Sequence, residues 1–361
     1  MAYRFKLNER AGKALLRTGT EQLQRALASL DAADRKTGIY GTRKCIKRLR
    51  SLLRLARPGL DKSAYQRLND TLRDAGRTLS AARDRDVLLA TVSDISAGSP
   101  ELRPTLRHVS SSIGPADDPA TSKMQAAMVR KARDLVQTAA DEWQHLALAD
   151  DAFETLAEGL KRGMRDLAEA FDATESGDEE AFHDLRKAVQ RHWRHMRLVE
   201  AGWPAYFVAR AEESKAISEL LGKAQDLTLL LHHLRDTGSV APPDADEVRQ
   251  AVEHRRATLQ EAARSRTQRL LAEGPRAHAR RATEYWTAAN ALRKANRNSK
   301  AEMPAAKAAD PGSAGDTNRP PPAAGAPRKR SAAAKPPPGE RSSKRPAKRP
   351  ARKPSARDKL G

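Results

Sequence analysis

The stretch IYGTRKCIKRLRSLLRLARPG (residues 39–59) decides how this chain is organised, because a similar stretch, FHDLRKAVQRHWRHMRLVEAG, follows at residues 182–202. Aligning Tyr40 with His183 gives an offset of 143 residues and superposes three cations of each stretch. The superposed pairs are Arg43 with Arg186, Lys44 with Lys187, and Arg48 with Arg191.

A second landmark recurs at nearly the same offset. LSAARDRDVLL (residues 79–89) corresponds to LGKAQDLTLLL (residues 221–231), with Asp84 aligned on Asp226. Two landmarks in the same order indicate an internal duplication. We expect one repeat at about residues 5–148 and the other at about residues 151–295.

The residue pattern predicts helices nearly throughout. Apolar residues recur every three to four positions, good helix formers dominate, and aromatic residues make up only 4% of the chain. Residues 97–121 are rich in turn formers and are expected to form a loop with one short helix. We expect an all-α fold of two antiparallel four-helix bundles packed side by side, one for each repeat. The helices are predicted at about residues 9–34, 38–57, 62–93, 123–148, 151–173, 177–202, 205–236, 244–273 and 276–294.

The C-terminal segment differs in composition from the rest. Residues 301–361 contain 15 Lys and Arg against 5 Asp and Glu, together with 12 of the 21 prolines. Such a segment cannot bury enough apolar surface to fold, so we expect residues 296–361 to form a disordered basic tail.

The chain as a whole has a net charge of +21, which indicates a polyanionic partner: nucleic acid, an anionic membrane or an inorganic polyanion. Cys45 is the single cysteine, which fits a reducing compartment. No apolar run approaches the length of a membrane span, and the N-terminus does not have the pattern of a signal peptide. We expect a cytoplasmic protein without a membrane span.

The first basic stretch places a row of cations along one helix face. Arg43, Lys47, Arg50 and Arg54 follow the helical period, and Lys44 and Arg48 flank them. From Tyr40 to Arg57 there are seven Lys and Arg and no Asp or Glu. Like charges at this spacing repel one another, so the row favours an external anion, and guanidinium groups suit phosphate oxygens.

The second basic stretch forms a comparable row about three turns long. It is thinner in charge, because Gln190 lies where Lys47 predicts a cation and Trp193 lies opposite Arg50. Its candidate anion ligands are His183, Arg186, Lys187, Arg191 and Arg194.

Catalytic and metal sites are not indicated. Two Glu-x-x-His pairs, Glu142/His145 and Glu180/His183, have the spacing of a bundle metal site, but partner glutamates are not found at matching positions. The sequence contains no glycine-rich phosphate loop and no nucleophile elbow. We therefore expect no cofactor, no metal and no enzymatic activity.

These motifs resemble the CHAD domain family, over roughly residues 5–295. The family pattern is a His, an Arg three residues later, and a Lys/Arg-Arg-Leu-Arg cluster at +7 to +10, followed by Arg-Asp-x-Asp-Val-Leu. The first repeat keeps residues 43 and 47–50 of this pattern and then Arg83, Asp84, Asp86, Val87 and Leu88. The second keeps His183, Arg186 and Arg191, whereas Tyr40 replaces the histidine of the first.

The resemblance implies two four-helix bundles related by a pseudo-two-fold axis. Their basic helices would line a shared groove or pore that binds inorganic polyphosphate. It also implies an association with polyphosphate granules. The second candidate function is an architectural protein that binds DNA or RNA through its basic tail, in the cytoplasm or on the nucleoid. An enzyme acting on phosphate esters is the third.

Overall fold

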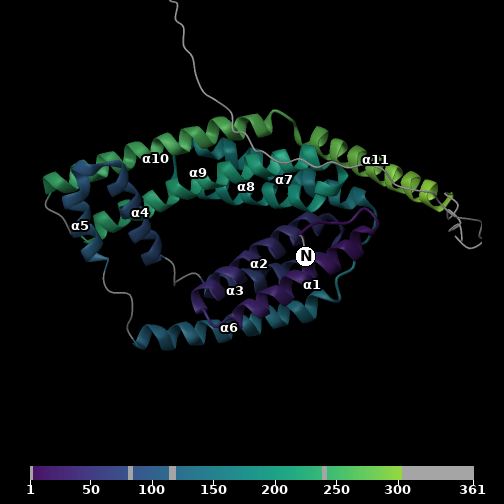
Figure 1. Cartoon of the computed structure of the whole chain (residues 1–361), viewed down its shortest axis with the longest axis horizontal. Coiled ribbons are helices and arrows are strands. Elements are labelled where there is room, and N and C mark those ends of the chain that lie inside the picture. Colours follow the sequence, from purple (N-terminus) through teal and green to yellow (C-terminus); the bar gives the residue numbers. More distant parts are fainter. Residues whose placement is uncertain (1–2, 80–83, 114–118, 238–241, 303–361) are drawn as a thin grey trace, which may run out of the picture. The chain divides into compact units, whose positions relative to one another are not determined.

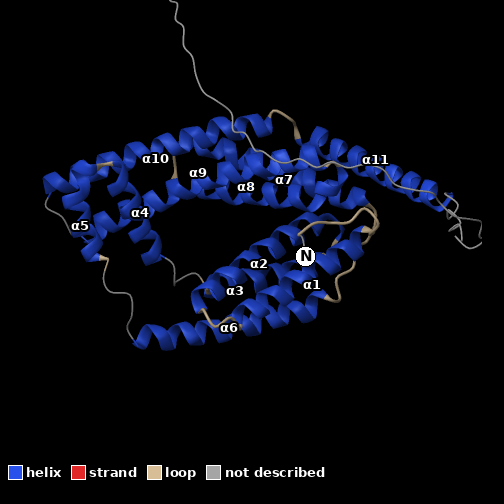
Figure 2. Ribbon diagram, in the orientation of Figure 1, coloured by secondary structure: helices blue, strands red, loops and turns tan. Residues whose placement is uncertain are grey.

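The structure is a computed structural model that describes residues 3–79, 84–113, 119–237 and 242–302. These residues form helices and the loops between them, and none of them lies in a strand (Figure 2). The expected all-α class is confirmed. Residues 1–304 belong to one compact unit.

Four helices of the first half pack into a ring around one core. Helix α1 (Ala11–Leu30) packs on α2 (Arg35–Ala56), α2 on α3 (Lys62–Thr78), α3 on α6 (Pro119–Trp143), and α6 again on α1 (Figure 1). Their apolar faces bury Leu15, Leu23, Leu49, Leu52, Leu72 and Trp143.

Helix α1 approaches α6 closely at one glycine. A Cβ atom at Gly19 would overlap the indole ring of Trp143, which is fully buried. Only a glycine leaves room for this ring, so the Gly19–Trp143 contact fixes how these two helices meet.

The helices of the second half pack in sequence. Helix α7 (Phe153–Ala173) packs on α8 (Glu179–Val199), α8 on α9 (Pro204–Thr237), and α9 on α10 (Pro242–Leu271). Helix α11 (Pro275–Glu302) packs on α7 and continues beyond residue 294, where its end was expected. The core among α7–α10 contains Met164, Leu167, Leu185, Val189, Ile217 and Leu221.

A third core combines helices from both halves of the sequence, as the first core also does through Leu156, Met196 and Trp286. Helices α4 (Asp84–Gly98) and α5 (Arg103–Ser112) pack against α9 and α10 (Figure 1). The division of the chain near residue 150 does not predict this packing, and the internal duplication stays a prediction. The apolar residues of this core include Leu88, Val92, Leu106, Leu230 and Val252.

The continuous helix expected at about residues 62–93 is wrong. Helix α3 ends at Thr78, and the next helix, α4, begins at Asp84. Arg43 caps this end of α3, because its guanidinium donates hydrogen bonds to the carbonyl oxygens of Gly76 (3.4 Å) and Leu79 (2.6 Å). A cation at a helix C-terminus satisfies carbonyl groups that the helix itself leaves unpaired.

Candidate anion-binding site

The two basic helices, α2 and α8, are in direct contact. The imidazole Nε2 of His195 on α8 lies 3.0 Å from the carbonyl oxygen of Ser51 on α2, and both residues are buried. Helix α2 also packs on α7, where a Cβ atom at Gly159 would overlap the carbonyl oxygen of Leu55. These contacts position the cation rows of the two helices beside each other.

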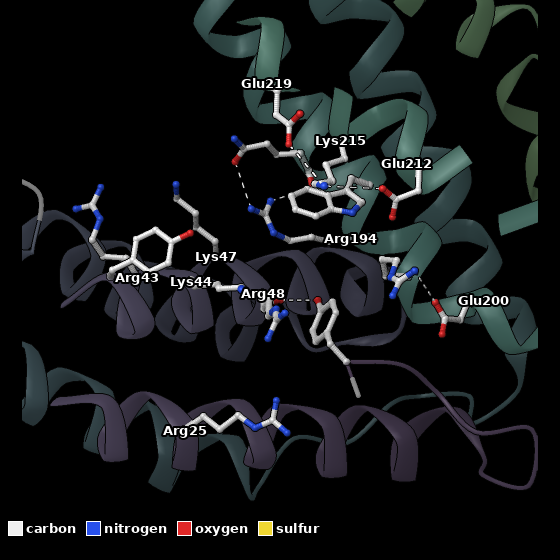
Figure 3. A pocket seen from close by; sticks show the side chains of 15 residues that line it. Arg25, Arg43, Lys44, Lys47, Arg48, Arg194, Glu200, Glu212, Lys215 and Glu219 are labelled. Carbon is white, nitrogen blue, oxygen red and sulfur yellow. Dashed lines mark hydrogen bonds and ion pairs between the residues drawn. The ribbon is translucent and has the colours of Figure 1, made fainter. Parts of the chain in front are cut away.

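A cavity of about 650 Å³ lies between the N-terminal half of α2 and the C-terminal half of α8. Helix α9 and the N-terminal segment complete its wall (Figure 3). Three carboxylates, Glu200, Glu212 and Glu219, line it together with a larger number of cations. The lining cations are Arg25, Arg43, Lys44, Lys47, Arg48, Arg194, Arg197 and Lys215.

Tyr3 connects the N-terminal segment to α2 inside this cavity. Its hydroxyl donates a hydrogen bond of 2.7 Å to the carbonyl oxygen of Arg48, and the Arg48 guanidinium lies 5.3 Å from the centre of its ring. Arg48 also donates to Gln22 Oε1 over 3.1 Å. Burial raises the pKa of the Tyr3 hydroxyl, so this group stays a neutral donor. Tyr3 therefore holds Arg48 in place without neutralising its charge.

Arg194 brings a cation from α8 to the same cavity. Its guanidinium donates to the carbonyl oxygen of Gln190 (2.8 Å) and lies 5.6 Å from the centre of the Trp193 ring. Burial, together with the charges of Arg48 and Arg186, lowers the pKa of Arg194 to about 10. Arg194 is still a cation at neutral pH, and its positive charge is not paired with a carboxylate among the described residues.

The carboxylates of the cavity pair with cations of its rim. Glu200 accepts from Arg4 (3.1 Å) and pairs with Arg197 (3.3 Å). Lys215 lies 3.9 Å from Glu212 and 3.7 Å from Glu219, all on α9. The cations on α2 lie across the cavity from this α9 cluster, so the α2 wall carries the surplus of positive charge (Figure 3).

Three arginines that the sequence placed in the same rows do not line this cavity: Arg50, Arg54 and Arg191. Arg50 donates to Asn69 Oδ1 (3.3 Å), and burial, with the charges of Arg54 and other arginines, lowers its pKa to about 10. Arg191 pairs with Asp166 on α7 at 3.5 Å, and burial, followed by the charge of Arg54, lowers its pKa. Arg50 and Arg54 on α2 and Arg191 on α8 form a second cationic cluster outside the cavity.

The N-terminal half of α8 is largely occupied by contacts within the protein. Gln225 on α9 donates to His183 Nδ1 (2.7 Å) and accepts from Arg186 (2.6 Å). Lys187 pairs with Asp184 at 2.7 Å and with Glu180 at 3.2 Å, both on its own helix. None of these candidate ligands lines the cavity.

The structure therefore brings together five of the predicted ligands: Arg43, Lys44, Lys47, Arg48 and Arg194. Sequence reasoning missed seven other residues of the cavity: Tyr3, the cations Arg25, Arg197 and Lys215, and the carboxylates Glu200, Glu212 and Glu219. Arg197 could have been found, because it continues the row of His183 and Arg194 by three residues.

The motif that begins at Arg83 lies partly outside the described residues. Arg83 lies outside the described residues, and Asp84 begins α4. Among the residues that the structure describes, no three His, Cys, Asp or Glu side chains gather as a metal site would require. In the same residues, no helix combines the length and the apolar character that a membrane span needs.

The described residues thus form a helical protein in which two packed helices line one cavity with cations. The family model of the CHAD domain matches residues 14–235. This chain belongs to the CHAD domain family.

A solved structure supports the same fold. The crystal structure of the CHAD domain from the plant Ricinus communis matches with a TM-score of 0.51 at 20% sequence identity. The match covers 74% of this chain and 95% of the plant domain. No curated protein matches this sequence.

Proposed function

We propose that this protein binds inorganic polyphosphate without converting it, through the cations of α2 and α8. The observation that carries the proposal is that Arg48 of α2 and Arg194 of α8 line one cavity, where eight cations outnumber three carboxylates. The family is associated with polyphosphate, and the residues of the cavity have the chemistry that this ligand needs.

Polyphosphate repeats one anionic group along a flexible chain, so many cations can act on it at once. Arginine can donate to two oxygens of one phosphate group, and lysine contributes a mobile point charge. Each contact releases condensed counterions from the polymer, which makes binding favourable at low salt and weak at high salt.

The second cationic cluster extends the proposed binding surface. Arg54 follows Lys44 by ten residues on α2, which corresponds to a rise of about 15 Å. A polymer bound at Lys44 and Lys47 can therefore continue along α2 to Arg50 and Arg54. This continuation gives a long chain an advantage over a short one.

The proposed binding would place the protein on polyphosphate granules, in the cytoplasm or at the nucleoid. Titration with long polyphosphate tests the proposal. We expect sub-micromolar affinity at low salt and a steep loss of affinity as salt increases. An affinity that does not change with salt would contradict it.

The second candidate function is architectural binding of DNA or RNA by the tail. It is favoured by the composition of residues 301–361, with KRPAKRPARK at residues 344–353. Such tails neutralise phosphates without reading sequence. The first candidate places the ligand on α2 and α8, and the second places it on the tail. Removal of the tail should therefore abolish binding only if the second candidate is correct.

A further inference from the structure

Two features of the cavity are not explained by a ligand that consists only of phosphate. The first is the pair of exposed carboxylates on α9, Glu212 and Glu219, which repel a polyanion. The second is the presence of aromatic rings in the wall, among them Tyr40 and Trp193. An inorganic phosphate chain has no apolar face that could stack on a ring.

Tyr40 is the most accessible of these rings. It lies on α2, one turn before Arg43 and Lys44, and 65% of its surface is exposed although it is a large aromatic residue. Trp193 is partly buried and already has the Arg194 guanidinium over its ring, so Tyr40 offers the more open face. Aromatic rings beside cations are the means by which proteins bind bases and phosphates together.

The α9 carboxylates supply hydrogen-bond acceptors for a base, in addition to the aromatic ring and the cations. The side chains of Glu212 and Glu219 are 57% and 63% exposed, and their pairing with Lys215 is loose, at 3.9 and 3.7 Å. Their oxygens are therefore available as acceptors for the N–H groups of a base edge. Figure 3 shows these carboxylates on one side of the cavity and Arg43, Lys44 and Lys47 on the other.

The size of the cavity also suits a small ligand. Its volume of about 650 Å³ falls within the range of about 300–1,000 Å³ that is usual for pockets that enclose small molecules. A long polymer crosses such a cavity, whereas a nucleotide fills it.

We propose that this cavity binds a nucleoside polyphosphate. Its phosphates contact the cations of α2 and Arg194, its base stacks on Tyr40, and the amino group of the base donates to Glu212 or Glu219. The inference rests on the proposed use of these cations for phosphate, and it adds a base to the ligand.

The test compares two ligands with the same number of phosphates, ATP and inorganic tripolyphosphate, by calorimetric titration of the full chain. We expect ATP to bind roughly tenfold more tightly, because stacking on an aromatic ring adds to the phosphate contacts. Tripolyphosphate carries at least as much negative charge as ATP, so attraction to the basic tail cannot by itself produce a preference for ATP.

Substitutions of Tyr40 identify the source of the preference. Tyr40→Ala removes the ring, and the ratio falls to about one. Tyr40→Phe keeps the ring and loses only the hydroxyl, so the preference for ATP remains. Because Tyr40 is exposed, both variants should fold, which circular dichroism verifies.

Neutralising the carboxylates should change the two affinities by different amounts. In the double variant Glu212→Gln/Glu219→Gln, tripolyphosphate binds more tightly because repulsion is lost. The same variant shows a smaller preference for ATP because the acceptors of the amino group are weaker.

The inference is overturned if tripolyphosphate binds as tightly as ATP, or if Tyr40→Ala leaves the ratio unchanged. A titration with long polyphosphate separates this failure from failure of the proposed function. If long polyphosphate binds and ATP has no advantage, only the base site is wrong. If ATP binds and long polyphosphate does not, the proposed function is wrong and the base site stands. If neither binds, both are wrong.

Discussion

His195 of α8 lies with its Nε2 atom 3.0 Å from the carbonyl oxygen of Ser51 on α2, in the interior of the protein. The carbonyl can only accept, so Nε2 carries the proton and donates. Burial lowers the pKa of His195 to about 3, against the opposing effect of this hydrogen bond. The histidine in this contact between the two basic helices is therefore neutral at physiological pH, because of its burial.

Acid should destabilise the fold through three buried histidines. Burial lowers the pKa of His192, His195 and His278 below the value of an unfolded chain, about 6.5. As the pH falls below 6.5, the unfolded chain binds protons that the folded chain does not, so the free energy of unfolding decreases. Each histidine contributes up to about 1.4 kcal/mol per pH unit.

Urea unfolding at pH 7.5, 6.0 and 5.0 measures this loss, in a range where ordinary carboxylates stay ionised. His195→Gln provides the control, because glutamine can also donate to Ser51 but does not titrate. Its stability should depend less steeply on pH than that of the wild type. Equal stability at pH 7.5 and 5.0 in the wild type would show that these histidines are not held neutral.

Tyr3 should contribute to stability through its hydroxyl and to binding through its ring. Tyr3→Phe removes the hydrogen bond to the Arg48 carbonyl and is expected to cost about 1 kcal/mol in the free energy of unfolding. It keeps the ring under the Arg48 guanidinium, so the affinity for polyphosphate should change little. Tyr3→Ala should weaken both. A loss of affinity in Tyr3→Phe as large as that in Tyr3→Ala would assign the effect to the hydroxyl instead.

Lysines that line the cavity should matter more for binding than lysines that lie outside it. Lys44→Gln/Lys47→Gln removes two exposed cations of the α2 wall. The slope of log affinity against log salt for long polyphosphate should become shallower by about 1.5, since each lost phosphate contact contributes about 0.7–0.9.

The matched control is Lys161→Gln/Lys187→Gln. These lysines lie outside the cavity, and each has a carboxylate partner on its own helix, Glu158 at 3.0 Å and Asp184 at 2.7 Å. The salt slope of this variant should equal that of the wild type. Similar slopes in the two double variants would move the site away from α2.

Removal of the tail should change assembly and leave stability as it is. Helix α11 continues to Glu302, so the truncation is made after Pro304. We expect a nearly unchanged thermal midpoint, because the removed segment contributes no core. The full chain should cross-link long polyphosphate into particles that scatter light, because the cations of the tail add valency, whereas the truncated chain should only bind it. Equal turbidity from both chains would contradict the bridging role.

The position and the end of α2 could be predicted from sequence, whereas the end of α3 could not. Leu49 and Leu53 follow the helical period and are buried in α2, and Pro58 with Gly59 marks its end. The end of α3 could not be predicted, because residues 79–84 contain no glycine or proline. Arg43 caps that end from another helix, and local sequence does not contain this tertiary contact.

The residues of the candidate site that lie on a single helix could be predicted from sequence. Lys44, Lys47 and Arg48 share α2, and the helical period groups them. Arg25 and Lys215 reach the cavity from α1 and α9, so their place depends on how the helices pack. The same periodicity placed Arg50 with Lys47, although the surroundings of Arg50 direct it to Asn69 and away from the cavity.

The central claim is that the helical unit itself, and not the tail, recognises polyphosphate. Competition with the chain truncated after Pro304 tests this claim most directly. Labelled long polyphosphate is bound and then displaced by unlabelled polyphosphate or by duplex DNA at equal phosphate concentration. We predict displacement by polyphosphate and little displacement by DNA, because a stiff duplex does not fit a cavity of about 650 Å³. Equal displacement by DNA, or no binding by the truncated chain, would contradict the account.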